Sequence, residues 1–139
     1  MKTDLLYTKF WDACFQDNVV ALIAVIEEIR EIDKKNDQGW SGIIIAAFNH
    51  SYLVLDILLD YGANINDANK KGTTVFMYAK TKCMNNKNFK ILIYLLEKGA
   101  DINARDHKKG WTVLDYVYSS GNIALTSFIQ NNGGKFSHE

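Results

Sequence analysis

The chain has 139 residues, of which 47% are hydrophobic, and its 16 basic and 16 acidic residues give a formal net charge of zero. The length predicts a single domain with enough apolar side chains for a continuous core, and the neutral balance gives no general reason to expect nucleic acid or an anionic membrane as partner. The longest apolar run, Val19 to Ile26, reaches about half of the roughly 18 residues that cross a bilayer, so no membrane span is expected.

The first predicted unit, residues 1–35, is a degraded version of the turn and two helices expected in each later unit. Ala13-Cys14 lies 33 residues before Ala46-Ala47, and Asp17-Asn18 lies 33 residues before His50-Ser51, where a bend between two helices is expected. The turn glycines of the later units are missing here. Because an end unit stacks on one neighbour only, we interpret this segment as an N-terminal capping repeat.

The second unit, residues 36–68, and the third unit, residues 69–106, show the pattern most clearly. Ser41 and Thr74 stand where the first helices start, since a hydroxyl oxygen there accepts a hydrogen bond from a free amide of the first turn. The second helices carry leucines at three- and four-residue spacing, which form one apolar stripe. Left-handed C-terminal caps are expected at the glycines that follow the second helices, Gly62, Gly99 and Gly133.

The third unit contains an insertion. Gly62 and Gly99 are 37 residues apart, four more than the basic period of 33. The extra residues lie around Cys83 to Asn88. Four residues make about one helical turn, so the insertion predicts either a longer first helix or a longer bend.

The fourth unit, residues 107–139, starts its first helix at Thr112, and Asp115 three residues later predicts a capping box. Gln130 replaces a leucine of the earlier second helices, which suits an outer face in water. We interpret this unit as a C-terminal capping repeat and expect the tail from Lys135 to Glu139 to be frayed. Two cap-like ends predict a monomer.

Two phrases recur in a fixed order along the chain. Tyr61 to Asn66 reads Tyr-Gly-Ala-Asn-Ile-Asn and returns at Lys98 to Asn103, while Gly39-Trp40-Ser41 returns at Gly72 and Gly110 in related form. With small pairs in the first helices and Leu-Leu pairs in the second, this pattern resembles the ankyrin repeat. The resemblance covers the whole chain and implies an all-α fold, an ankyrin-repeat solenoid of stacked helix-turn-helix units joined by β-hairpin-like turns.

The sequence departs from the Thr-Pro-Leu-His pattern usual in that family. The first helices begin Ser41-Gly42, Thr74-Val75 and Thr112-Val113, and the chain contains no proline. Proline is favoured at the first helical position, and the family's histidine ties adjacent turns together. Since each lost hydrogen bond costs about 0.5–1 kcal/mol, we expect a less stable array than a consensus one.

The resemblance implies binding of another protein by a concave face made of the hairpin tips and the exposed side of the first helices. Tyr7 and Phe15 are the equivalents of these contact positions in the first unit. Aromatic anchors are favoured at binding hot spots, but the same residues also suit packing between hairpins and helices. The predicted partner-binding residues are Trp40, Phe48, Trp111, Gln38, Asn49, Lys70, Lys71, Thr73, Lys82, Lys108 and Lys109.

Lysines gather in the third unit and continue at the next hairpin tip. They form either a solvated surface or a stripe for an acidic protein partner, and a nucleic-acid contact is less favoured because the total charge is neutral. The alternatives to a general binding module are an inhibitory or immunity-type partner of an effector protein, and a scaffold in which the stack itself is the function. A binder should expose the three aromatic side chains at 40, 48 and 111, and a scaffold should bury them. The lysines of the stripe are Lys70, Lys71, Lys80, Lys82, Lys87, Lys90, Lys108 and Lys109.

Histidine and cysteine are too sparse to predict a catalytic or metal site. His50, His107 and His138 do not stand with Cys, Asp or Glu at metal-ligand spacing, and no phosphate-binding glycine loop occurs. The sequence therefore predicts a protein that is not an enzyme and has no cofactor. The first residues lack the features of a signal peptide, and Cys14 and Cys83 are expected to be buried thiols, which predicts a cytoplasmic protein.

Overall fold

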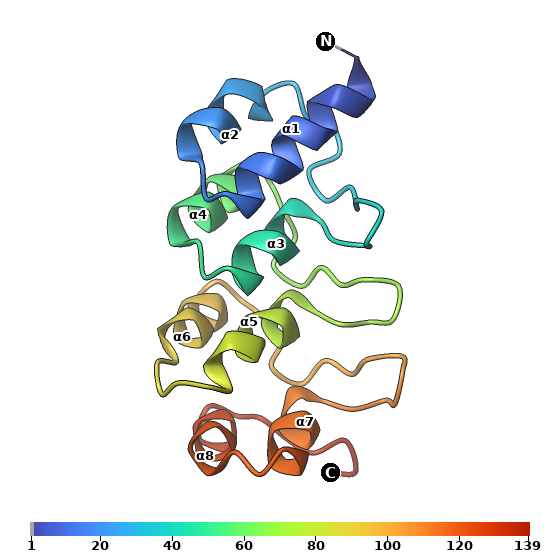
Figure 1. Cartoon of the computed structure of the whole chain (residues 1–139). Coiled ribbons are helices and arrows are strands. Elements are labelled where there is room, and N and C mark those ends of the chain that lie inside the picture. The colour runs from blue at the N-terminus through green and yellow to red at the C-terminus, as the bar shows by residue number, and fades with distance from the viewer. Residues whose placement is uncertain (1) are drawn as a thin grey trace.

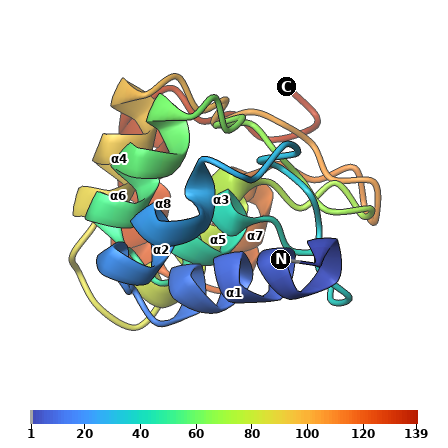
Figure 2. The same ribbon diagram turned by 90° about the horizontal axis from the view of Figure 1, so that it is seen from above.

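The computed structural model describes residues 2–139 and shows a stack of four helix pairs (Figure 1). This part of the chain has eight helices and no strand, which confirms the all-α class. The odd-numbered helices form one layer and the even-numbered helices a second, and the long loops project to one side (Figure 2). The helices are α1 (Thr3–Phe15), α2 (Val19–Ile26), α3 (Gly42–Phe48), α4 (Tyr52–Asp60), α5 (Val75–Cys83), α6 (Lys90–Glu97), α7 (Val113–Ser119) and α8 (Ile123–Asn131).

Helices α3, α5 and α7 begin directly after the predicted hydroxyl residues. The side-chain oxygens of Ser41, Thr74 and Thr112 accept hydrogen bonds from the amides three residues on, at 3.5, 3.2 and 3.4 Å. The Asp115 carboxylate in turn accepts from the Thr112 amide at 2.9 Å, which confirms the predicted capping box. These bonds satisfy donors that the first turn of a helix leaves free.

The loops between helix pairs are hairpin-like turns, as the resemblance implied. Ala68 and Thr74 form an isolated antiparallel bridge on either side of Gly72. Positive φ angles at the turn glycines and after the second helices confirm the left-handed positions, with values of +78° at Gly72, +90° at Gly62 and +97° at Gly99. A side chain is strained in this conformation, so glycine is favoured at these positions.

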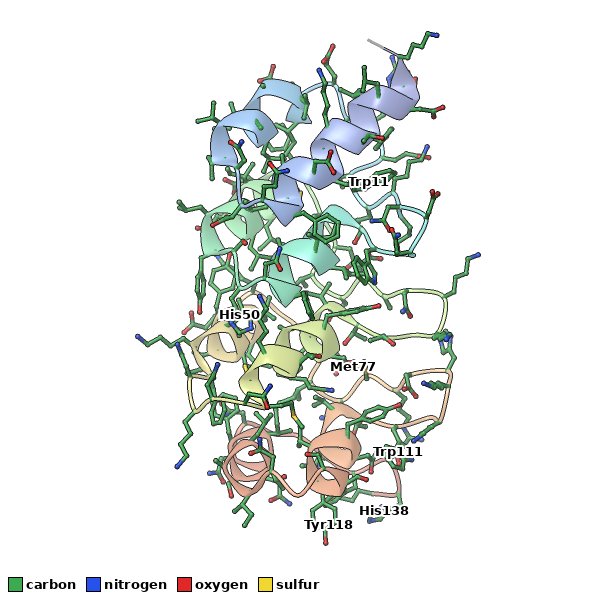
Figure 3. All side chains as sticks on the ribbon, in the orientation of Figure 1. Trp11, His50, Met77, Trp111, Tyr118 and His138 are labelled. Carbon is green, nitrogen blue, oxygen red and sulfur yellow. The ribbon has the colours of Figure 1, made fainter. Side chains whose placement is uncertain are left out.

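His50 occupies the bend between α3 and α4 with a φ of +57°. Its Nε2 lies 2.9 Å from the carbonyl oxygen of Ala79 in α5. Because a carbonyl oxygen only accepts, Nε2 carries the proton and ties this bend to the next repeat. The bend lies on the side of the stack opposite to Trp111 (Figure 3). His50 therefore has a structural role at this bend.

The core runs without interruption between the two helix layers. The leucine stripes of the second helices supply much of it, since Leu55, Leu58, Leu92 and Leu95 are fully buried. Burial of one such side chain stabilises the fold by about 1.5–3 kcal/mol. No repeat encloses a core alone, so each depends on its neighbours for this burial.

Adjacent first helices are not equally spaced. Gly42 lets α1 and α3 approach closely, because a Cβ atom there would lie 2.9 Å from the Phe10 ring. Helices α3 and α5 also lie close together, whereas α5 and α7 stand further apart (Figure 1). The larger side chains of Lys80 and Tyr116 lie in this wider interval, lining a hollow between α5 and α7.

The insertion in the third repeat is divided between helix and bend. Helix α5 has nine residues, against seven in α3, and the bend before α6 covers residues 84–89, compared with 49–51 in the preceding pair. Both predicted alternatives therefore occur in part.

Equivalent asparagines join consecutive loops along the stack. The Asn66 side chain accepts from the Asp101 amide at 2.7 Å and donates to the Gly99 carbonyl at 3.3 Å. The Asn103 side chain repeats this arrangement one unit later, accepting from the Lys135 amide at 2.7 Å and donating to a carbonyl at 3.0 Å. Each of these asparagines is the last residue of a recurring Gly-Ala-Asn/Asp-Ile-Asn segment. The segment therefore recurs where one repeat is hydrogen-bonded to the next.

The expectation of a frayed tail is wrong. The carbonyl of Lys135 accepts from the Thr112 hydroxyl at 2.6 Å, and the amide of Ser137 donates to Asp115 at 3.1 Å. The Phe136 ring lies 5.3 Å from the Tyr118 ring, centroid to centroid. The tail is therefore held against the start of α7 by the residues of its capping box. Gln130 is exposed, as predicted.

Candidate functional site

The candidate site is the face formed by the hairpin tips and the adjoining side of the first helices (Figure 2). The four repeats contribute equivalent positions, so the face is continuous along the stack. Five of the eleven predicted positions are half-buried on it, Trp40, Phe48, Asn49, Thr73 and Trp111, and six are exposed, Gln38, Lys70, Lys71, Lys82, Lys108 and Lys109.

One side chain organises each hairpin tip. Asn36 Oδ1 accepts from the amides of Gln38 and Trp40, both at 3.0 Å. Asn69 does the same one repeat later, and Asp106 in the next, at distances of 2.9–3.1 Å. Such side-chain turns fix the backbone of a loop. Sequence reasoning missed these residues, although an Asn or Asp three or four residues before the turn glycine recurs in each repeat.

Trp40 bridges the second and third repeats. Its ring lies 5.7 Å from the Phe15 ring and 6.3 Å from the Tyr78 ring, centroid to centroid. Its indole N–H donates to the Tyr78 hydroxyl at 3.1 Å, and that hydroxyl also accepts from the Asn69 side chain at 2.8 Å. Trp40 is therefore half-buried by packing within the protein and presents only part of its ring to a partner.

Phe48 and Phe15 present the apolar part of this face. Phe15 is 42% exposed, and Phe48 is half-buried with the Lys82 ammonium 5.2 Å above its ring. Asn49 has a structural contact, because its side chain donates to the Phe15 carbonyl at 3.1 Å. Phe15, Trp40, Phe48 and Tyr78 enclose a shallow apolar crevice. We name these four residues the aromatic patch.

Tyr7 does not belong to this surface. Its side chain is only 5% exposed, and its hydroxyl accepts from the Glu31 amide at 3.0 Å. Of the two alternatives for Tyr7, binding and packing, the structure shows packing, because α1 turns this ring toward the loop that follows α2. Phe15, at the end of the same helix, remains available.

The fourth repeat places Trp111 against Tyr116, with ring centroids 5.0 Å apart. The Lys109 ammonium lies 4.5 Å above the Trp111 ring, a cation–π geometry. The Tyr116 hydroxyl donates to Asp106 Oδ2. In both repeats a tyrosine of the first helix is thus hydrogen-bonded to the side chain that organises its hairpin, Tyr78 to Asn69 and Tyr116 to Asp106. This shared arrangement was not recognised from the sequence.

The carboxylate of Asp106 is buried at the base of its hairpin. Burial raises its pKa, but hydrogen bonds from the Tyr116 hydroxyl and from the amides of Lys109, Trp111 and Gly110 outweigh this effect and lower the pKa below its usual range. Asp106 is therefore ionised at neutral pH, and its negative charge is engaged by the hairpin.

The lysines do not form a single stripe. Lys70, Lys71, Lys108 and Lys109 are exposed at two adjacent hairpin tips, and Lys80 and Lys82 lie on α5. Lys87 and Lys90 lie in the bend before α6 and at its start, on the opposite side of the stack (Figure 1). Of the two alternatives for these lysines, a solvated surface and one stripe, a single stripe of all eight does not form, since the fold places Lys87 and Lys90 on another surface.

The remaining chemistry of the described residues is limited. Residues 2–139 contain no group of three His, Cys, Asp or Glu side chains placed to hold a metal ion. Cys14 and Cys83 are both buried free thiols, as predicted. Burial raises the pKa of Cys14 to about 12 and that of Cys83 to about 11, so neither is a reactive thiolate at neutral pH. Across the same residues, every helix is too short or too polar to span a bilayer.

Stacked helix pairs, turn glycines and long loops that project to one side define a helical repeat protein of the solenoid class. The family model for ankyrin repeats, in three copies, matches residues 10–106. The chain belongs to the ankyrin-repeat family. Ankyrin repeats are in general protein–protein interaction modules, and the family is typically non-enzymatic.

Three relatives illustrate this membership. Ankyrin repeat and KH domain-containing protein mask-1 of Caenorhabditis elegans is 29% identical over 97 residues, which are 70% of this chain and 4% of that protein. An ankyrin repeat protein of Acanthamoeba polyphaga mimivirus is 36% identical over 123 residues, with 76% of this chain and 16% of the relative covered. One from fowlpox virus (strain NVSL) is 33% identical over 94 residues, 66% of this chain and 27% of the relative. The chain thus spans only 4% to 27% of the length of these relatives.

Proposed function

We propose that this ankyrin-repeat chain binds an acidic protein partner through its concave face, with the aromatic patch and the neighbouring lysines as the contact surface. The observation that carries the proposal is their adjacency. Tyr78 lines both the apolar crevice of the patch and the hollow that contains Lys80 and Lys108. A partner surface therefore meets apolar and cationic groups side by side.

The two kinds of contact contribute differently. Burial of the exposed parts of Phe15 and Phe48 favours binding by about 25 cal/mol for each Å² removed from water. The exposed lysines at the hairpin tips add charge complementarity, which raises the association rate and selects against basic partners more than it adds affinity. The two buried free thiols support a reducing compartment such as the cytoplasm as the site of action.

A scaffold role is the second candidate, because Trp40 and Trp111 are packed within the protein rather than fully exposed. A scaffold of this kind uses its stack as a spacer and does not depend on the concave side chains. An inhibitory role, in which the same face blocks an effector protein, is a special case of the main proposal.

The test is affinity capture with matched surface variants. Immobilised wild-type protein, a Phe15→Ala/Phe48→Ala double variant and a Leu53→Ala variant are compared for the proteins they retain. Leu53 is 66% exposed on α4, in the second helix layer, and serves as the control. We expect the same partner on wild type and the Leu53 variant, and its loss from the double variant. Equal retention by all three would favour the scaffold role.

A further inference from the structure

We propose that the hollow between α5 and α7 receives the carboxylate of one Asp or Glu side chain of the partner, with Lys80 as the cation that holds it. The inference rests on the proposed function, because it specifies which group of an acidic partner the concave face selects. It also defines the partner segment as an acidic side chain next to an apolar one.

The hollow lies between α5 and α7, which stand further apart than the other first helices. Its volume is about 210 Å³, and its lining includes Met77, Tyr78, Lys80, Lys108 and Tyr116. Small-molecule sites usually enclose about 300–1,000 Å³, so this one suits a single side chain. Thr73 and Thr81 also line it.

Lys80 has no carboxylate partner in this hollow. Its ammonium lies 5.4 Å from the centroid of the Tyr116 ring. Among residues 2–139, the only acid–base pair within 4.0 Å is Lys35 with Asp67. Lys80 is half-buried, and burial lowers the pKa of its ammonium group. An incoming carboxylate would therefore pair with a cation that has lost part of its hydration without gaining an anionic partner.

The acid that lines the hollow, Asp106, does not neutralise Lys80. One of its carboxylate oxygens accepts from the amides of Lys109 and Trp111, and the other from the Tyr116 hydroxyl. Both carboxylate oxygens are therefore already engaged by hydrogen bonds to the hairpin and to Tyr116. The hollow therefore stays cationic at neutral pH, which is the charge complementarity that a partner carboxylate requires.

The arrangement favours a protein side chain over nucleic acid. A phosphate backbone is followed by a row of cations along its path. Here Lys87 and Lys90 lie on the other side of the stack, and Lys80 stands in a hollow next to the aromatic patch. A partner segment with an acidic residue next to an apolar one fits this arrangement, because the acid can enter the hollow while the apolar side chain contacts the aromatic patch.

The experiment selects peptides from a random library displayed on phage, with full-length wild-type protein, Lys80→Gln and Lys90→Gln as baits. We expect wild type and Lys90→Gln to enrich peptides with Asp or Glu beside an apolar residue, and Lys80→Gln to lose the acid preference. A synthetic peptide with the enriched sequence should bind Lys80→Gln at least about tenfold more weakly by isothermal titration calorimetry. Lys80→Arg keeps the charge and should retain the acid preference.

The outcomes separate the two proposals. If Lys80→Gln keeps the acid preference, the inference about Lys80 is overturned and the proposed function stands. If wild type enriches peptides that bind the aromatic patch but carry no acid, the inference and the acidic character of the partner are overturned, and only binding through this face stands. If no peptide is enriched, both are overturned. Binding of a labelled single-stranded DNA oligonucleotide that Lys80→Gln abolishes, without any acidic peptide, would assign the hollow to phosphate and also overturn the inference. Circular dichroism of each variant confirms that it is folded.

Discussion

The indole N–H of Trp40 donates to the hydroxyl of Tyr78 at 3.1 Å, across the boundary between the second and third repeats. The same hydroxyl accepts from Asn69 at 2.8 Å, so its two acceptor sites are filled by donors from two hairpins. One tyrosine on α5 therefore fastens its own hairpin and the preceding one to the first-helix layer. These bonds fix Trp40 and Tyr78 of the aromatic patch, and a preorganised surface loses less entropy on binding.

Trp40→Phe should destabilise the protein, because it removes the donor and leaves the ring stacking largely in place. The expected loss is about 0.5–1.5 kcal/mol in the free energy of unfolding, measured with urea. Tyr78→Phe should cost more, since it leaves both Trp40 and Asn69 without their acceptor. A double-mutant cycle with these two variants should give a clear coupling energy. Additive effects would show that the bond contributes nothing to stability.

The turn glycines of two adjacent hairpins offer a matched test of hairpin stacking. A Cβ atom at Gly72 would lie 2.9 Å from the His107 amide nitrogen, whereas at Gly110 it would meet nothing within 4 Å. Both glycines have positive φ, so alanine is strained at either position. Gly110→Ala should cost about 1–2 kcal/mol in the free energy of unfolding from backbone strain alone.

Gly72→Ala should cost more than Gly110→Ala, because the next hairpin must also move. The contact that would be disturbed is the hydrogen bond from the His107 amide to the Lys71 carbonyl at 2.7 Å. Thermal unfolding of the two variants under the same conditions measures the difference. Equal melting temperatures would mean that adjacent hairpin tips do not support one another.

Acid should destabilise the fold through Asp106. Hydrogen bonds hold its pKa below the value of about 3.9 expected for an unfolded chain. A carboxylate with a lowered pKa stabilises the folded state above the unfolded pKa, and this contribution is lost as the pH falls through the folded pKa. Asp106→Asn should therefore flatten the decline in the free energy of unfolding below about pH 4. Urea unfolding at several pH values measures this decline.

Asp33 provides a control of opposite sign. Burial raises its pKa, only partly offset by the hydrogen bond from the Asn64 amide, and the nearby charge of Asp67 raises it further. A raised pKa means that protonation favours the folded state, so Asp33 opposes the loss of stability on acidification. Asp33→Asn should therefore steepen the decline in the free energy of unfolding at low pH, whereas Asp106→Asn should flatten it. The same slope in both variants would contradict these assignments.

The thiols of Cys14 and Cys83 should react with Ellman's reagent only when the stack opens. Both side chains are fully buried, and burial raises the pKa of each thiol. Labelling in native buffer should therefore be slow and should become complete in denaturant. Single Cys→Ala variants would assign the rate to each thiol. Rapid native labelling would show that the repeat concerned opens readily.

The repeat architecture was predictable because it depends on local rules that the sequence repeats. Helix starts at Ser41, Thr74 and Thr112 and the glycine caps require only a hydroxyl or a missing Cβ at a fixed position. The burial of the core leucines was predictable from their three- and four-residue spacing along the second helices. The tail was misjudged, since its order comes from bonds to Thr112 and Asp115 far along the chain.

The site was predictable in outline and not in detail. Position relative to the turn glycines placed the eleven contact candidates on or beside one face, but it did not indicate how far Trp40 and Trp111 pack against Tyr78 and Tyr116. Those contacts depend on the spacing of neighbouring first helices, which the turn glycines do not indicate. The hollow lined by Lys80 lies in the wider interval between α5 and α7.

The unequal spacing of the first helices also bears on the cooperativity of folding. In a solenoid, each repeat is coupled only to its neighbours, so the weakest interface decides where the chain divides into separate folding units. Close packing joins α1, α3 and α5, while the wider interval lies before α7. We therefore expect the first three repeats to unfold as one cooperative block and the last repeat to open from it at lower free energy. Amide hydrogen exchange in α7 and α8 should accordingly be faster than in α3 and α4.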